Sequence, residues 1–311
     1  MSLVYNAVKL LLWSKNLGAS FERTLTLGHQ GLSCSRGQLR RAVHDFGLSI
    51  SEEQLDRCMR HAPCTPLFAD EFLRFLGAKE IVSVDRNDFE GATRLHDLNE
   101  PFPESDRAAF SFVLDGGTLE HIFNYPAALR YCLEVVRPGG HFLTTAPVQN
   151  HLGHGFYQPS PETFFRVFSA DNGFALRKMV LYETHKANAA FFEVNDPAVT
   201  GMRTELRSDK HMDLGVLAKR TAVVPVLARP PQQSDYVACW ESHRRAAANP
   251  DLARPSLIWR VQKALNPYWP FWLRRWKSAY LYSRIHGAPK LSNRRHFRKL
   301  TRKEIFSERA E

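Results

Sequence analysis

Short strand-like runs alternate with helical runs along most of this chain, and this alternation restricts the fold more than any other feature. The strand-like runs cover residues 23–27, 80–84, 92–95, 110–114, 141–145, 174–183 and 214–218. The helical runs cover residues 35–44, 51–75, 127–136 and 161–169. Strands that alternate with helices predict an α/β fold, with a mainly parallel, doubly wound sheet.

The chain divides into three parts. We expect residues 1–20 to contain an amphipathic helix that packs on the body, and an interfacial role for it stays open, although it is too short to span a bilayer. Residues 21–228 carry the alternating pattern. A Pro- and Gln-rich linker begins at Arg229, and residues 229–311 form a basic tail that we expect to be helical.

The charge is concentrated in the tail. Residues 241–311 contain 17 Lys and Arg against 5 Asp and Glu, whereas residues 1–240 contain 25 against 27. Tryptophans alternate with cations at residues 259–277, a mixture that suits an anionic membrane surface. Two interpretations stay open: a peripheral membrane contact through residues 254–303, or tryptophans that pack on the body. Stacking on nucleic acid is disfavoured, because the body carries no basic footprint.

The five cysteines form no Cys-x-x-Cys pair, and the N-terminus lacks the basic region and cleavage site of a secretory signal. Reduced thiols are therefore expected. The sequence predicts a cytoplasmic protein, and peripheral attachment to the inner face of the membrane remains open.

In α/β folds, ligands bind outside the carboxyl ends of the strands. A glycine turn that includes Gly28 and Gly31 follows the first strand, and Asp85 ends the second. Glycines let backbone approach a ligand closely, and an acid after the second strand can accept ribose hydroxyls. These are features of a nucleoside site. Each residue also has a structural interpretation: the glycines as a plain turn, Asp85 as a helix cap and Asp97 as an Asx-turn.

Three motifs follow one another at a characteristic spacing. The run from Phe110 to Leu129 contains a strand, a Leu-Glu-His turn at residues 119–121 and a helix. A Pro-Gly-Gly turn at residues 138–140 enters the next strand, and an acidic, Pro-containing loop begins at Asp97. With these motifs, residues 22–185 resemble the class I S-adenosylmethionine-dependent methyltransferases. The resemblance implies a Rossmann-like, seven-stranded sheet whose last strand is antiparallel.

The resemblance also implies S-adenosylmethionine as cofactor. Asp85 matches the acid that binds the ribose, and Asp97 matches the acid that meets the adenine amino group. The cofactor-binding residues predicted in this way are Gly28, Gly31, Asp85, Asp97, Asp115, Gly116 and Gly117. The first glycine loop departs from the family pattern, because Thr26 replaces an acid and Gln30 replaces the middle glycine.

Methyl transfer to oxygen benefits from a general base. The candidates are His121 in the Leu-Glu-His turn and His154 after the fifth strand, and Tyr157 is a candidate for acceptor recognition. A packing role for His121 and Tyr157 stays open. His151 and His154 could form a metal pair, but the sequence shows no third ligand, so we predict no metal.

The sequence thus predicts a methyltransferase for a small-molecule, glycan or lipid-linked acceptor. The alternative is a non-catalytic methyltransferase-like module that docks on a membrane or a protein.

Overall fold

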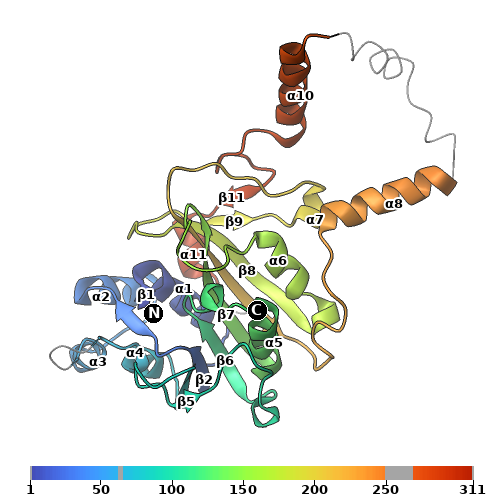
Figure 1. The fold of residues 1–311 in the computed structure, drawn as a ribbon. Helices are drawn as coiled ribbons and strands as arrows, with labels where there is room; N and C mark the ends of the chain where they lie inside the picture. The colour runs from blue at the N-terminus through green and yellow to red at the C-terminus, as the bar shows by residue number, and fades with distance from the viewer. Residues whose placement is uncertain (1, 62–65, 249–268, 310–311) are drawn as a thin grey trace. The chain divides into compact units, whose positions relative to one another are not determined.

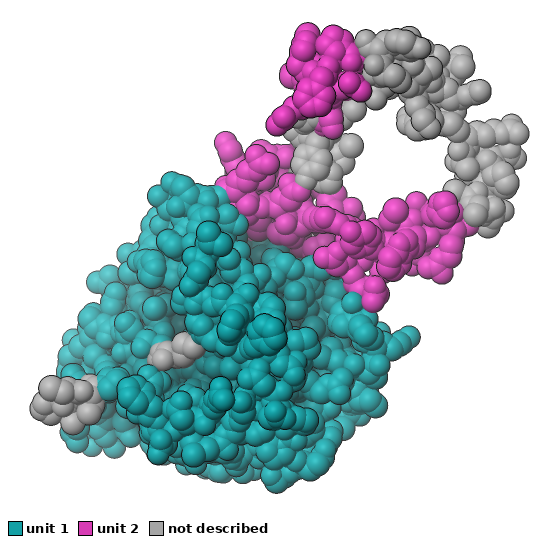
Figure 2. Space-filling model, in the orientation of Figure 1, with its two compact units in different colours: residues 1–194, 208–231, 299–311 teal, residues 195–207, 232–298 magenta. Residues whose placement is uncertain are grey.

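The computed structural model describes residues 2–61, 66–248 and 269–309. The chain separates into two compact units (Figure 2). Unit 1 comprises residues 1–194, 208–231 and 299–311, and unit 2 comprises residues 195–207 and 232–298. Residues 299–311 therefore belong to the same unit as the α/β body.

A large mixed sheet forms the centre of the fold (Figure 1). Its strands are β2 (Arg23–Leu27), β4 (Glu80–Asp85), β5 (Arg94–Leu95), β6 (Phe110–Asp115), β7 (Val136–Gln149), β8 (Phe174–Glu183), β9 (Phe192–Val194), β10 (Met212–Arg220) and β11 (Phe297–Lys299). Among the described residues the order of these nine strands is β11-β9-β8-β10-β7-β6-β2-β4-β5. A separate two-stranded parallel ladder joins β1 (Ser2–Val4) to β3 (Gly31–Ser33).

The prediction of a seven-stranded sheet was wrong in the number of strands, because β9 and β11 extend the sheet at one side. The expected antiparallel strand is present: β10 lies between β7 and β8 and is antiparallel to both. The strands β2, β4, β5, β6 and β7 are parallel to their neighbours among these five. The α/β class and the parallel half of the sheet follow the sequence prediction.

Helices cover both faces of the sheet. In unit 1 they are α1 (Tyr5–Asn16), α2 (Arg36–Asp45), α3 (Glu52–Cys58), α4 (Asp70–Phe75), α5 (Tyr125–Val135), α6 (Pro161–Val167) and α11 (Arg302–Ser307). Helices α1 and α2 lie on one side of the sheet and α5 and α6 on the other (Figure 1). Phe112 and Leu114 join the core beneath α1 to α4, while Val113, between them, is buried outside that cluster. This alternation is what a strand buried on both faces requires.

The N-terminal helix is present, but it is not amphipathic in its surroundings. Every residue of α1 from Tyr5 to Ser14 is buried. Even Lys9 is inside, and its Nζ donates to the carbonyl oxygen of Ala187 at 2.6 Å. A helix that is covered on all sides has no face left for a membrane surface.

The C-terminal residues contain further elements. Unit 2 holds α7 (Pro197–Thr200), α8 (Ser234–Ala248) and α10 (Phe271–His286). The last helix of unit 1, α11, has a capping box between Thr301 and Glu304 and buries Ile305. Residues 249–268, which include Trp259 and part of the expected membrane-contact segment, lie outside the described residues. In the part of the chain that the structure describes, no helix combines the length and the apolar character needed to cross a membrane.

Candidate functional site at the carboxyl edge of the sheet

The carboxyl ends of three neighbouring parallel strands bring the predicted site residues together. Leu27 of β2 is paired with Val84 of β4 on one side and with Asp115 of β6 on the other. The residues that follow these positions therefore leave the sheet at one edge. Gly28, Asp85 and Gly116 meet there, as the sequence predicts for an α/β fold.

Gly28 is the turn residue of this edge. Its φ of +72° lies in the left-handed region that favours glycine, and its N–H donates to the carbonyl oxygen of Val84 at 2.7 Å. A Cβ added to Gly28 would lie 3.6 Å from Thr118 Oγ1 and 3.7 Å from Asp85 Oδ2. Asp85 Oδ1 accepts the N–H of Arg86, whereas Oδ2 has no hydrogen-bond partner among the described residues. One carboxylate oxygen therefore remains available beside the glycine turn.

Gln30 occupies the space next to Gly116. The Gln30 side chain is 2% exposed, and its amide donates to the carbonyl oxygen of Leu27. A Cβ added to Gly116 would overlap Gln30 Oε1 and would lie 3.0 Å from a methyl group of Leu3. Oε1 itself is buried and has no hydrogen-bond partner within the described part of the chain. The side-chain oxygen of Gln30 is therefore an unsatisfied hydrogen-bond acceptor that lies next to Gly116.

The other predicted cofactor residues have local roles. Gly31 belongs to β3 and pairs with Ser2 of β1, so it lies in a ladder instead of a turn. Asp97 forms the Asx-turn that the sequence left open: its Oδ1 accepts the N–H of Asn99 at 2.9 Å. Arg86 lies 3.5 Å from the other oxygen of Asp97. The hydrogen bond from Asn99 holds the pKa of Asp97 below its usual value.

Asp115 stabilises the turn that carries Gly116 and Gly117. Its carboxylate is completely buried and accepts the N–H groups of Gly117, Thr118 and Leu119 at 3.3, 2.7 and 3.3 Å. Its second oxygen accepts the hydroxyl of Thr144 at 2.7 Å. Burial raises the pKa of Asp115 despite these hydrogen bonds. Both carboxylate oxygens of Asp115 accept hydrogen bonds from the protein itself. Asp115 therefore stabilises the turn, and the groups that could bind a ligand or react are its neighbours.

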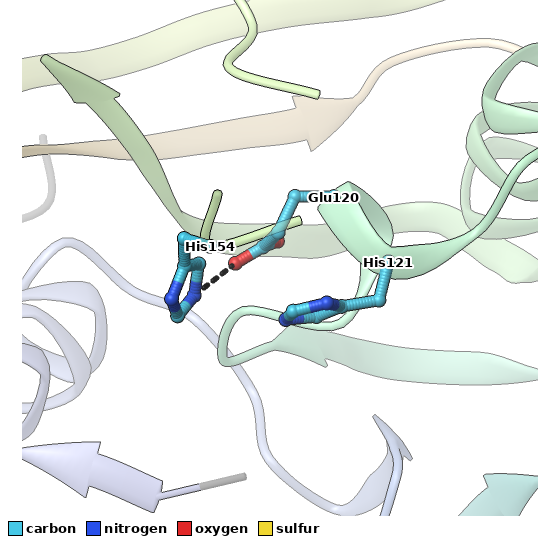
Figure 3. Close-up of side chains that lie close together, drawn as sticks. All are labelled: Glu120, His121 and His154. Atoms are coloured by element: carbon cyan, nitrogen blue, oxygen red, sulfur yellow. Dashed lines mark ion pairs between the residues drawn. The ribbon is translucent and has the colours of Figure 1, made fainter. Parts of the chain in front are cut away.

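The turn continues into a cluster of Glu120, His121 and His154 (Figure 3). Glu120 and His121 belong to η2 (Leu119–His121), and His154 comes from the loop after β7. His154 Nε2 lies 3.6 Å from Glu120 Oε1. Glu120 is 2% exposed, and its Oε2 has no hydrogen-bond partner in the residues that the structure describes. Burial, with the nearby charge of Asp115, raises the pKa of Glu120 to about 8.

Backbone hydrogen bonds attach the His154 loop to η2. The carbonyl oxygen of Glu120 accepts the N–H groups of both Phe156 and Tyr157, at 2.8 and 3.2 Å. The Tyr157 hydroxyl donates to the carbonyl oxygen of Phe123 at 2.8 Å. The Tyr157 side chain therefore helps to hold this loop in place, which is the structural role that the sequence left open. The structure brings His121 and His154 together, with their ring centroids 5.1 Å apart.

Two acids near these histidines, Glu120 and Asp213, were not predicted as site residues from the sequence. Glu120 is part of the Leu-Glu-His turn, so the sequence displayed it, but nothing there indicated that it would be buried. Asp213, in β10, lies 3.1 Å from Nε2 of His151, and burial raises its pKa to about 6. Only the pairing of β10 with β7 brings Asp213 to this edge.

No protein-family model matches the chain, and no curated protein matches it in sequence. Solved structures resemble it distantly. A candidate S-adenosylmethionine-dependent methyltransferase from Listeria monocytogenes has a TM-score of 0.37 and 13% identity, over 70% of this chain and 100% of that one. The branched-chain polyamine synthase of Thermus thermophilus, solved with 5'-methylthioadenosine, has a TM-score of 0.37 and 13% identity, over 75% of this chain and 62% of that one.

The N-methyltransferase NodS of Bradyrhizobium japonicum, in complex with S-adenosylhomocysteine, has a TM-score of 0.37 and 11% identity. The match covers 70% of this chain and 86% of NodS. These similarities are too distant to assign an activity, so the function of this chain has to be argued from its own site.

Proposed function

We propose that this chain is an S-adenosylmethionine-dependent methyltransferase whose acceptor is a small molecule, a glycan or a lipid-linked molecule. S-adenosylmethionine, when bound, supplies an electrophilic methyl group, so the protein mainly has to position the acceptor. The observation that carries this proposal is the available Oδ2 of Asp85 beside Gly28 at the carboxyl edge. A carboxylate in that place can accept ribose hydroxyls.

Gln30 is the residue that we expect to bind the aminoacyl group of the cofactor. Thr26, which stands where the family usually has an acid, is buried, and its hydroxyl donates to the carbonyl oxygen of Gly28 at 2.8 Å. Thr26 therefore cannot replace the acid. A buried acceptor without a partner, such as Gln30 Oε1, costs free energy, and an ammonium group would satisfy it. In this proposal Gln30 therefore replaces the acid that the family usually has at the position of Thr26.

The acceptor side of the proposed site is the cluster of Glu120, His121 and His154. Thr118 connects it to the cofactor side, because its hydroxyl donates to the carbonyl oxygen of Leu27 at 2.8 Å while its chain leads into η2. An acceptor hydroxyl must lose its proton as it is methylated, and this cluster is where that proton would be taken up.

The alternative function, a non-catalytic module, is favoured by one observation. The Gln30 amide and the Leu3 side chain already pack against Gly116, where the family's glycine motifs approach the cofactor. The two functions therefore differ in the role of one side chain: Gln30 either receives the cofactor or blocks it.

Titration calorimetry of the full chain with S-adenosylhomocysteine tests the proposal. We expect binding, and we expect Asp85→Ala to weaken it by about 10- to 100-fold, the value of hydrogen bonds to a charged group. Asp88→Ala is the matched control, because Asp88 is an exposed acid three residues further along. No binding by the unmodified chain up to millimolar ligand would contradict the enzyme proposal. Unchanged binding by Asp85→Ala would show that the site lies elsewhere.

Variants of Gln30 separate the two functions. 5'-Methylthioadenosine lacks the aminoacyl group, so we expect the chain to prefer S-adenosylhomocysteine over it. Gln30→Leu keeps the volume and removes the acceptor, and it should lower this preference by about tenfold. If Gln30 blocks the site instead, Gln30→Gly would tighten the binding of S-adenosylhomocysteine and Gln30→Leu would leave the preference unchanged.

We also propose that the basic C-terminal segment contacts anionic membranes, which would place a lipid-linked acceptor near the enzyme. Aromatic side chains of α10 support this proposal, because Trp272 and Trp276 are 68% and 62% exposed. Arg274, Arg275 and Lys277 alternate with them in the same helix. Aromatic rings among cations suit the headgroup region of a membrane.

A further inference from the structure

We propose that Glu120, His121 and His154 form a binding site for a divalent transition-metal ion, with Zn²⁺ as the representative. One ligand atom from each of these residues lies within 4.8 Å of the other two (Figure 3). The ion itself would bind whether or not the chain transfers methyl groups; its use in catalysis rests on the proposed function.

The chemistry of the three donors selects the class of metal. Two imidazoles and one carboxylate are the ligands of many catalytic zinc sites, and imidazole suits zinc and its neighbours in the first transition row. Mg²⁺ and Ca²⁺ prefer sites made of oxygen alone. Glu120 is the third ligand that the sequence did not show. The histidine that accompanies His154 in this site is His121, whereas the sequence suggested His151.

Glu120 gives the independent reason to expect a cation. Its carboxylate is almost completely removed from water, and Oε2 has no hydrogen-bond partner among the described residues. A buried, incompletely satisfied carboxylate is costly unless a positive charge accompanies it. His154, whose side chain is half exposed, is the ion-pair partner that the structure records for Glu120, and its Nε2 is 3.6 Å from Oε1, longer than a hydrogen bond. A metal ion bound by both residues would supply the missing charge.

The geometry requires only a small adjustment. Bonds of about 2.0–2.2 Å to a tetrahedral ion place the ligand atoms about 3.4 Å apart. The Glu120–His154 pair is already at 3.6 Å, because two backbone hydrogen bonds attach the residue 154–157 loop to the carbonyl of Glu120. His121 is neither fully buried nor held by a hydrogen bond of its ring that the structure records, so its ring can rotate toward the other two.

Three protein ligands leave at least one coordination position open, which is the arrangement of catalytic metal sites. An acceptor oxygen in that position would have its pKa lowered by the ion and would be held at the edge shared with Asp85. The bound hydroxyl would then lose its proton to water before methylation, and this step would replace direct proton uptake by Glu120, His121 or His154, whose donor atoms would be occupied by the ion.

Calorimetry with ZnCl₂ on the full chain, prepared without a histidine tag, tests the inference. We expect one Zn²⁺ per chain, and His154→Asn should weaken binding at least about tenfold, the smallest effect usual for groups that support a metal site. The exposed position of His154 makes misfolding of this variant an unconvincing explanation. His185→Asn is the matched control, because His185 is an exposed histidine outside the cluster. Equal losses in both variants would overturn the site, as would the absence of binding.

Glu120→Gln provides a second measurement that is independent of catalysis. Zn²⁺ should raise the Tm of the unmodified chain and should not raise that of Glu120→Gln. Co²⁺ should show visible absorption bands with the chain and lose them in the same variant. His211, whose ring centroid lies 4.9 Å from that of His151, marks the rival position for an ion. Binding that survives Glu120→Gln and His154→Asn but is lost in His211→Asn would place the ion there and refute the proposal. S-adenosylhomocysteine binding, measured in parallel, shows separately whether the cofactor site holds.

Discussion

Arg220 is completely buried at the end of β10, and its guanidinium group connects parts of the chain that are far apart in sequence. Nη1 donates to the carbonyl oxygens of Leu133, Glu134 and Val136 at 3.0, 2.8 and 2.6 Å. Because the last carbonyls of an α-helix lack partners within the helix, Arg220 satisfies the C-terminal end of α5. The sequence gives no hint of this, since an arginine beside Lys219 is expected to be solvated.

Substitution of Arg220 by methionine should strongly destabilise the fold. Arg220→Met removes the donors to three buried carbonyl groups, which we expect to lower the free energy of unfolding by about 3 kcal/mol or more. Glu134 also loses its contact with Arg220 but keeps its ion pair with Arg107 at 2.9 Å. Urea denaturation followed by circular dichroism measures the change. Arg130→Met is the control, because Arg130 is exposed and makes one hydrogen bond, to Leu227. Equal losses in both variants would contradict this role of Arg220.

At the scale of the elements, the pairing of β7 with its neighbours encloses a histidine. His141 is 2% exposed and is paired with Phe112 on one side and Lys219 on the other. Burial lowers its pKa to about 4, and the positive charges of Lys219 and Arg177 add to the effect. The Pro-Gly-Gly turn was expected to precede the strand that begins at His141, but β7 begins at Val136 and includes it. Residues 138–140 form an irregularity within β7, and the ladder to β6 shifts its register there.

The buried His141 predicts a stability that falls in mild acid. The unfolded chain takes up a proton near pH 6.5, whereas the folded chain does so only near pH 4, so this contribution is complete above pH 6.5 and is lost as the pH falls toward 4. Between pH 7 and pH 5 the loss should be about 2 kcal/mol. His141→Gln should remove that part of the pH dependence in urea denaturation. The exposed His44→Gln should leave it unchanged, and a His141→Gln variant with the same pH dependence as the unmodified chain would refute the prediction.

At the scale of the whole molecule, charge and exposed aromatic rings gather in the C-terminal third of the chain. Residues 241–311 carry the entire excess of positive charge. Unit 2 exposes Trp240, Phe271, Trp272 and Trp276. Unit 1 contains the proposed site and the large sheet, apart from Phe297 and Arg298 of β11. The proposed membrane contact and the proposed cofactor site thus lie in different parts of the chain.

Vesicle co-sedimentation tests this division. The full chain should pellet with vesicles that contain phosphatidylserine and much less with phosphatidylcholine alone, and added salt should release it, because screening weakens charge attraction. The double variant Trp272→Ala/Trp276→Ala should pellet several-fold less. Phe89→Ala is the control, because Phe89 of unit 1 is 91% exposed. Equal pelleting of the double variant and the unmodified chain would remove the membrane contact.

The amino-acid pattern alone determined the α/β class, most strands and the edge where the site lies. The alternation of strands and helices left few topologies, and a parallel sheet brings the residues after its strands to one edge whatever the details of packing. Gly28, Asp85 and Gly116 were therefore predictable as neighbours. The capping box of Ser35 and Gln38 at the start of α2 is another local feature, because capping depends on a few adjacent residues.

Tertiary structure decided everything that depends on burial and on contacts between distant segments. The sequence could not show that Glu120 is desolvated beside His154. The loop that contains His154 is 34 residues further along the chain, and only folding brings its backbone N–H groups to the carbonyl oxygen of Glu120. It could not show that α1 is covered on every side, or that Gln30 packs against Gly116. Periodicity records which residues share a face of one element, whereas desolvation depends on what the rest of the chain places over that face.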